Sequence, residues 1–393
     1  MNPFGDRVNQ GVSYYASGLT GLRGFAAFWV FMYHAWVMAI QKPVTVRIGF
    51  LSVPLTPFFS GGWAGVDLLF TLSGFLLTLP YAEAMVEQKK EPGLPGYFLR
   101  RVLRIFPAYY GQLAVLLLLA GLGICGAVPS VANVLVHLFM IHGISFQYFQ
   151  ALNGIWWTLP VFFSFYLVFP ILIAILRRHH WLLLPIGSVV LAVFYRYVMF
   201  QYVADKPAEY VIWVLDQLPG HIDQFVFGMI GAYLFMRYRR SDGIHRVLPT
   251  VSMILGVLGI VVCFYLLYIH QHVYWQGHWL LFVWHGCFGL SATLLFYGIA
   301  SNCSFGRRLF GNRFMVFTGV ISYSLYLWHF LIIDWILKSN LLSGVKGDVF
   351  LNLLIVSLPS VFVISVISYL IFERPFLSLR AHVRSGWKRA PKG

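Results

Sequence analysis

The sequence is poor in charged residues and in cysteine. Charged side chains make up 10 % of its 393 residues, against about 25 % in soluble domains, which excludes an ordinary soluble domain. The four cysteines are scattered, without the spacing of a metal site or a redox pair, so we interpret them as small apolar packing residues. The first 22 residues also lack an apolar core and a small-residue cleavage site, so they are not expected to be a signal peptide.

What the sequence does contain is long apolar segments. Hydrophobic residues make up 59 % of the chain and aromatic residues 18 %, and apolar runs of about 20 residues are long enough to cross a bilayer as helices. We therefore predict an all-α, polytopic membrane helical bundle with about ten transmembrane helices. The predicted spans cover residues 22–41, 58–80, 106–124, 155–176, 181–203, 218–236, 248–269, 279–301, 314–337 and 349–371.

One further apolar stretch, residues 131–146, is predicted not to cross the membrane. It is short, and it is interrupted by His137 and His142. If it crossed, Arg177 and Arg178 would lie on the outer side, against the positive-inside rule. We expect this stretch to be re-entrant or interfacial on the outer side of the membrane.

The distribution of basic residues predicts the orientation. With ten spans, 22 of the 28 Lys and Arg residues fall in segments on one side, which the positive-inside rule makes the cytoplasmic side. Both termini are then cytoplasmic; residues 1–376 form the membrane domain and residues 377–393 a basic cytoplasmic tail. The net charge of +15 follows from this topology and from attraction to anionic lipid, so no nucleic-acid partner is predicted.

Arg23 and His34 are the most informative pair in the first predicted span. Eleven residues of helix separate them by about 16 Å, which is about half of a ~30 Å hydrocarbon core. If Arg23 marks the edge of the bilayer, His34 lies near its middle. Ionisable groups at this depth are costly and are by default functional, so the pair indicates a route for an anionic ligand into the membrane.

Asp67 is predicted at a similar depth in the second span, about 13 Å from its outer end. A carboxylate beside an imidazole fixes its tautomer and raises its basicity, the usual support for a general base. We therefore expect Asp67 to orient His34 as a catalytic pair. A structural hydrogen bond between two buried polar groups is the alternative.

Two arginines at the inner end of the third span, Arg101 and Arg104, are one helical turn apart and face the same way. With Arg23 they can form a phosphate-binding cluster on the inner surface. An ordinary positive-inside anchor is the alternative interpretation.

Other ionisable residues have simpler interpretations. His329, in the ninth span, is either a direct participant or a satisfied core histidine. Arg196 and Asp223 can form an internal ion pair with a purely structural role. No metal is predicted, because the histidines near the outer face lack the spacing of a zinc site. These histidines are His270, His272, His278 and His285.

Together these motifs resemble the acyltransferase-3 family of bacterial integral-membrane O-acyltransferases. The resemblance extends over nearly the whole chain, and it lies in the combination and order of the motifs. The matching segments are Arg23 to His34, Gly65-Val66-Asp67, Ser73-Gly74-Phe75, Arg100-Arg101-x-x-Arg104, Trp157-Thr158-Leu159, Phe165-Tyr166-Leu167, Asp223, Tyr323 to His329 and Phe372-Glu373-Arg374-Pro375.

The resemblance implies a ten-helix bundle in the bacterial inner membrane. It also implies an acyl-coenzyme A donor at the cytoplasmic side, with acetyl the expected acyl group, and an acceptor hydroxyl on a sugar or lipid-linked glycan. His34 and Asp67 are then the catalytic residues. The implied donor-binding residues are Arg23, Ser73, Arg101 and Arg104, and the implied acceptor-binding residues are Trp157, Phe162, Tyr166 and His329.

Phe162 departs from the family pattern, which has a glutamate three residues before the Phe165-Tyr166-Leu167 triplet. Because an aromatic ring cannot bind a proton, three possibilities stay open: an impaired enzyme, an enzyme that uses another residue, or a deliberately inactivated form. A transporter or permease is the rival class, but it predicts internal repeats and paired broken helices, which the sequence does not show. The predicted function is therefore acyl transfer, with His34 as general base or as an acylated nucleophile.

Overall fold

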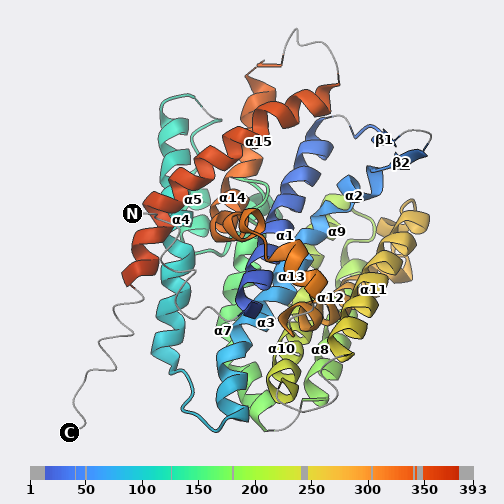
Figure 1. Ribbon diagram of the computed structural model, residues 1–393. Coiled ribbons are helices and arrows are strands. Elements are labelled where there is room, and N and C mark those ends of the chain that lie inside the picture. Colours follow the sequence, from blue (N-terminus) through green and yellow to red (C-terminus); the bar gives the residue numbers. More distant parts are fainter. Residues whose placement is uncertain are drawn as a thin grey trace, which may run out of the picture. The chain divides into compact units, whose positions relative to one another are not determined.

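The computed structural model describes residues 14–39, 41–48, 51–124, 126–178, 181–239, 247–301, 304–339, 341–342 and 348–379. Within these residues the chain is almost entirely helical, with a single two-stranded ribbon (Figure 1). The predicted all-α fold class is confirmed. Most of the predicted basic tail, residues 380–393, lies outside the described residues.

Ten long helices coincide with the ten predicted spans. They are α1 (Tyr14–Ala39), α3 (Gly65–Val86), α4 (Leu94–Gly121), α7 (Thr158–Arg177), α8 (Leu183–Val203), α10 (Leu218–Tyr238), α11 (Leu248–His270), α12 (Trp279–Ala300), α14 (Arg313–Lys338) and α15 (Val349–Ser368). Among the described residues, eight helices are long and apolar enough to cross a membrane: all of these except α1 and α10, which are 26 and 21 residues long. The protein is therefore a polytopic membrane protein.

Shorter elements connect the long helices. The helical ones are α2 (Thr56–Ser60), η1 (Gly62–Ala64), α5 (Val131–Leu138), η2 (His142–Ile144), α6 (Phe146–Phe149), α9 (Ala208–Leu215), η4 (Tyr274–Gln276), α13 (Ser304–Phe310) and η5 (Tyr369–Glu373), the last a π-helical turn that continues α15. The ribbon, which the sequence analysis missed, pairs β1 (Thr45–Ile48) with β2 (Leu51–Pro54) in antiparallel register.

Some helices begin earlier than the apolar runs indicate. α4 begins at Leu94, so Arg101 and Arg104 lie inside the helix and not before it. Pro95, in the first helical turn, has the fixed backbone angle that favours a helix start. Arginine is itself a good helix former. Hydropathy therefore indicates only the part of the helix that lies in the hydrocarbon core. The helix itself extends further, into the polar interface.

The contacts divide the chain into two compact units, which we describe separately. The first unit comprises Met1–Tyr33, Pro43–Glu91 and Leu167–Val320. The second unit comprises His34–Lys42, Pro92–Tyr166 and Ile321–Gly393.

The close packing of α3 against α10 forms the centre of the first unit. A Cβ atom at Gly74 would lie 2.0 Å from the Phe225 carbonyl oxygen, and one at Gly228 would lie 2.0 Å from the Thr71 carbonyl oxygen. The two helix backbones therefore touch at residues without side chains, as small residues allow in membrane bundles. This packing fixes the positions of Asp67 on α3 and Gln224 on α10, both buried.

A buried ion pair joins α8, α10 and α12 in the first unit. The Arg196 Nη2 atom lies 2.9 Å from Asp223 Oδ1 and 3.0 Å from Oδ2. The same guanidinium donates to the carbonyl oxygens of Gly220 and Phe282, each at 2.8 Å. Both side chains are 1 % exposed. The ion pair that the sequence makes possible is therefore present, and its purely structural role stays a prediction.

A buried polar network joins α4 to α14 in the second unit. The Gln112 side chain donates to the Leu327 carbonyl oxygen at 2.6 Å and accepts from the Trp156 indole at 2.9 Å. The Tyr326 hydroxyl donates to the Ile155 carbonyl oxygen at 3.0 Å. These bonds hold the segment before α7 against the middle of α14, which carries His329.

The apolar stretch 131–146 is built from short pieces in the second unit. α5 has eight residues, far fewer than the ~20 that a spanning helix needs. His137 and His142 are buried, and their rings stack in parallel with centroids 4.2 Å apart. The expectation that this stretch does not cross as a helix is confirmed.

Stability is expected to fall on acidification because of His137 and His142. Burial lowers the pKa of both imidazoles below the ordinary value of 6.5, that of His142 to about 4. The unfolded chain therefore binds protons first, and folding free energy present above pH 6.5 is lost as the pH falls towards about 4. We expect a lower melting temperature at pH 5 than at pH 7.5 in detergent, and a smaller difference for His142→Gln. An identical pH dependence in that variant would contradict this assignment.

Candidate functional site

His34 and His329 form a direct histidine pair in the second unit. The His329 Nε2 atom lies 3.2 Å from His34 Nδ1, with ring centroids 5.1 Å apart. His329 is fully buried and His34 is half-buried. The ring of Phe330 meets the His34 ring edge-on at 5.4 Å. Both histidines are recognisable as candidates in the sequence, but their pairing is not.

The hydrogen bonds of this pair define the tautomers of the neutral rings. His329 Nδ1 lies 3.2 Å from the Leu325 carbonyl oxygen, which can only accept, so Nδ1 carries the proton. His329 Nε2 is then an acceptor, and His34 Nδ1 is the donor to it. The lone pair of His34 is consequently on Nε2, the nitrogen that a general base uses. The contact with His329 Nε2 therefore orients the His34 ring.

Asp67 has its partners within the first unit. Its Oδ1 atom accepts from Gln224 Nε2 at 2.5 Å and from His285 Nδ1 at 2.7 Å. Asp67 lies in the first unit and His34 in the second, so the predicted support of His34 by Asp67 stays a prediction. The sequence analysis missed Gln224 and His285 as partners, because both lie more than 150 positions away in the chain.

The sequence analysis places His285 with the histidines near the outer face, but its partner in the structure is Asp67. α12 begins at Trp279, so His285 is about 10 Å further along the helix than His278. The rings of His270 and His278 stack on each other at 4.4 Å, whereas His285 binds Asp67 inside the unit.

Among the described residues, those around Asp67 include a group that could hold a metal ion. Ligand atoms of Asp67, His221 and His285 all lie within 4.8 Å of one another. A carboxylate, Asp216, lies 3.1 Å from His221 Nε2, an arrangement typical of outer-shell support for a metal ligand. Since Asp67 already accepts two short hydrogen bonds, we interpret the group as a hydrogen-bonded polar core.

The arginines predicted to hold the donor have different surroundings. In the first unit, Arg23 donates to the Gly319 carbonyl oxygen at 3.1 and 2.5 Å. In the second unit, Arg104 pairs with Glu373 at 2.6 Å, and the guanidinium of Arg101 lies 5.8 Å from the centre of the Tyr166 ring. Arg101 and Arg104 are neighbours on one helix, as predicted, but the charge of Arg104 is compensated by Glu373.

Glu373 is a buried carboxylate to which the sequence analysis gave no separate role. It is 1 % exposed and lies in the π-helical turn η5, a feature often found at functional sites. Its second oxygen accepts from the backbone and the hydroxyl of Ser324 at 3.1 and 2.6 Å. Glu373 therefore fixes both Arg104 and the helix turn of α14 that precedes His329. The sequence feature that could have pointed to Glu373 is the Phe372-Glu373-Arg374-Pro375 motif that contains it.

Three of the four predicted acceptor residues lie at the start of α7 or just before it in the second unit, whereas His329 lies on α14. The Phe162 and Tyr166 rings are neighbours on one helix face, 6.4 Å apart. Trp157 packs near Phe149 at 6.1 Å. Phe162 and Trp157 are half-buried, whereas Tyr166 is buried. The donor residue Ser73 is half-buried on α3 in the first unit.

Comparison with known proteins assigns this architecture and this set of motifs to a class of membrane proteins. The family model for the acyltransferase domain (acyltransferase-3) matches residues 17–373. The chain therefore belongs to the acyltransferase-3 family, as the sequence motifs indicated.

Several relatives carry the names of O-acetyltransferases. A Staphylococcus aureus protein (strain COL) with such a name is 24 % identical over 385 residues, 92 % of this chain and 57 % of its own length. The peptidoglycan O-acetyltransferase OatA of Listeria monocytogenes is 24 % identical over 92 % of this chain and 56 % of its own length.

Nodulation protein 10 of Rhizobium leguminosarum bv. viciae is 30 % identical over 175 residues, 40 % of this chain and 44 % of its own length. This chain spans little more than half the length of the two O-acetyltransferase relatives. No solved structure matches the chain.

Proposed function

We propose that this protein is a membrane O-acyltransferase that moves an acyl group, expected to be acetyl, from acyl-coenzyme A to a hydroxyl of a sugar or lipid-linked glycan. The observation that carries the proposal is the His34–His329 pair, because it places a half-buried imidazole in direct contact with a fully buried histidine that can accept from its proton-bearing Nδ1. The names of the relatives support O-acetyl transfer, and one of them gives peptidoglycan as the acceptor.

The proposed reaction begins with proton removal from the acceptor. His34 Nε2 takes the hydroxyl proton as the oxygen attacks the thioester carbonyl carbon, forming the new ester C–O bond. The C–S bond then breaks, and the coenzyme A thiolate that leaves takes this proton from His34. His34 Nδ1–H stays hydrogen-bonded to His329 Nε2 throughout, so the imidazolium that forms in between has an acceptor beside it.

The remaining roles follow the expectations from the sequence. Arg23, Ser73, Arg101 and Arg104 are proposed for the donor, with Arg104 acting through its ion pair to Glu373. Trp157, Phe162, Tyr166 and His329 are proposed for the acceptor side, although the contact with His34 also makes His329 a positioning residue. Asp67 is proposed as catalytic support, now with His285 and Gln224 as its own partners.

The donor is proposed to enter from the cytoplasmic face of a bacterial inner membrane, with both chain termini on that side. This orientation follows from the 22 basic residues on one side of the ten predicted spans. A phosphatase reporter fused after Lys42 is expected to be active outside, and a fluorescent reporter at the C-terminus to be active inside. A C-terminal reporter on the outside would contradict an even number of spans.

The function is tested by supplying labelled acetyl-coenzyme A to membrane vesicles of cells that make the protein. We expect base-labile label in the glycan fraction, in vesicles whose cytoplasmic face is exposed. If Phe162 marks an inactive form, the protein will bind coenzyme A without forming ester. Family membership argues against the rival class, a transporter, which would move label across the membrane without ester formation.

A further inference from the structure

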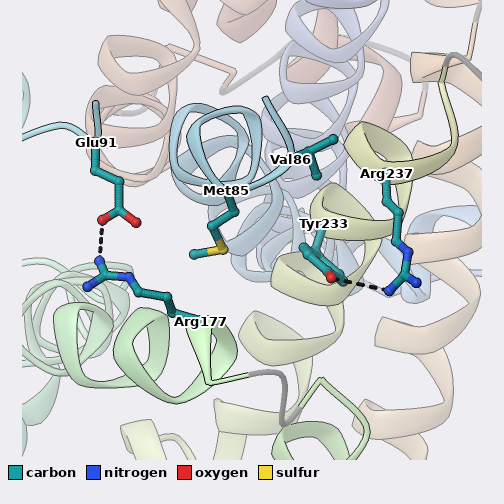
Figure 2. Close-up of a pocket in the computed structure, with 6 residues that line it drawn as sticks. All are labelled: Met85, Val86, Glu91, Arg177, Tyr233 and Arg237. Carbon is teal, nitrogen blue, oxygen red and sulfur yellow. Dashed lines mark hydrogen bonds and ion pairs between the residues drawn. The ribbon is translucent and has the colours of Figure 1, made fainter. Parts of the chain in front are cut away.

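The first unit contains a cavity where three helices end. Its volume is about 450 Å³, within the range of small-molecule sites. The ends of α3, α7 and α10 surround it (Figure 2). The lining residues are Met85, Val86, Glu91, Arg177, Tyr233 and Arg237.

Arg237 differs from its basic neighbours in its partners. Arg177 pairs with Glu91, and Arg239 and Lys89 both pair with Glu87. Arg237 instead donates to the hydroxyl of Tyr233 at 3.3 Å. Within the described part of the chain, no carboxylate lies at ion-pair distance from Arg237, so none of the described acidic side chains compensates its positive charge.

Aromatic contacts hold Arg237 at the cavity. Tyr233, one helical turn before it, is buried, with its hydroxyl towards the guanidinium (Figure 2). The guanidinium also lies 5.7 Å from the centre of the Tyr238 ring. Neither partner neutralises the charge, so the guanidinium keeps donors for an anion, and a planar guanidinium matches a phosphate group well.

Part of the cavity lining is apolar. Met85 lies between the Arg177–Glu91 pair and Tyr233, and Val86 faces the same space (Figure 2). Arg177 already compensates Glu91, so the net charge of the lining groups is positive. A cation beside a methionine and a valine suits a phosphate ester attached to an apolar or extended organic chain.

We propose that this cavity is a binding site for the phosphate-ester end of an amphiphile, with Arg237 as its principal ligand. Two sources supply this chemistry: the phosphates of the acyl-coenzyme A donor, or the headgroup of an anionic phospholipid. Binding of the acyl-coenzyme A phosphates rests on the proposed function, whereas binding of a phospholipid headgroup does not. The site adds to the predicted donor arginines, since Arg104 already has a carboxylate partner and Arg23 a carbonyl partner.

Binding to the full-length protein in nanodiscs of phosphatidylcholine tests the proposal without turnover. One arm titrates coenzyme A; the other replaces part of the lipid with phosphatidylglycerol and measures its retention by native mass spectrometry. Arg237→Gln is expected to weaken one of the two by at least about 10-fold, the scale of a lost charge-assisted hydrogen bond. The matched control is Arg308→Gln, an exposed arginine on α13 that does not line the cavity, with an expected change below about 2-fold.

A second variant tests the site independently, in case Arg237→Gln fails to fold. Val86→Glu places a carboxylate at the partly exposed edge of the cavity, so it should repel the same ligand and weaken it in the same arm. A change in the coenzyme A arm identifies the donor, and a change in the lipid arm identifies a phospholipid. If both variants bind coenzyme A and phosphatidylglycerol as the parent protein does, the proposed binding site is contradicted. This result leaves the proposed acyl transfer intact if labelled ester still forms.

Discussion

His34→Gln is expected to lower the rate of acyl transfer by about 10²–10⁴-fold, the contribution of a general base. Glutamine cannot take up a proton at neutral pH. Its amide still fills much of the space of the imidazole, so the half-buried position beside Phe330 should remain packed. Expression and coenzyme A binding are expected to stay close to those of the parent protein. The measurement is the initial rate of labelled acetyl transfer, normalised to the amount of folded protein.

Two further histidine variants make this result specific. His272→Gln changes an exposed histidine at the end of α11 and should leave the rate unchanged. His329→Gln keeps an oxygen that can accept from His34 Nδ1–H, whereas His329→Leu removes the acceptor and should be slower. Equal rates for the Gln and Leu variants would mean that His329 is only a packing residue. Full activity of His34→Gln would show that the base lies elsewhere.

Asp223→Asn is expected to destabilise the protein by about 3–5 kcal/mol, the cost of leaving one buried charge without its partner. Arg196 is 1 % exposed and bonds to two carbonyl oxygens, so its guanidinium cannot leave the unit to find water. That loss is comparable to the 5–15 kcal/mol by which domains are usually stable. We expect a markedly lower melting temperature in detergent and aggregation during purification.

An exposed pair in the same chain provides the control. Asp334 and Lys338 form an ion pair one helical turn apart, with the lysine 75 % exposed, and such pairs contribute about 0–1 kcal/mol. Asp334→Asn should therefore melt close to the parent protein. The double variant Arg196→Met/Asp223→Leu should recover part of the stability, because apolar residues of similar size often replace a buried pair. If Asp223→Asn melts with the parent, the pair is not structural.

The spans and the Arg196–Asp223 pair were predictable from the sequence. In lipid every backbone polar group must be satisfied within the segment, so an apolar run of sufficient length can hardly be anything but a helix. A charged side chain inside such helices is costly unless an opposite charge compensates it. An ion pair between Arg196 and Asp223 was therefore possible from the sequence. The span predicted to begin at residue 106 misses the first turns of α4, since arginines at the interface add nothing to an apolar run, although the spacing of Arg101 and Arg104 already indicated helix there.

The partners inside the candidate site were not predictable. His34 and His329 are 295 positions apart, and Asp67 and His285 are 218 apart. Depth along a helix follows from its rise of 1.5 Å per residue, and depth alone suggested Asp67 for His34. Which helices are neighbours, and which face each turns towards the other, depends on packing details such as the Gly74 and Gly228 contacts. No short motif encodes those details.

The most direct test of the account follows the acetyl group from donor to product. Purified protein, reconstituted in vesicles, is given acetyl-coenzyme A with a deuterated acetyl group and a glycan acceptor, and the products are examined by mass spectrometry. The account predicts a deuterated O-acetyl ester on the glycan and an equal amount of free coenzyme A, both lost in His34→Gln. Release of coenzyme A without ester, or ester formation that does not depend on His34, would contradict it.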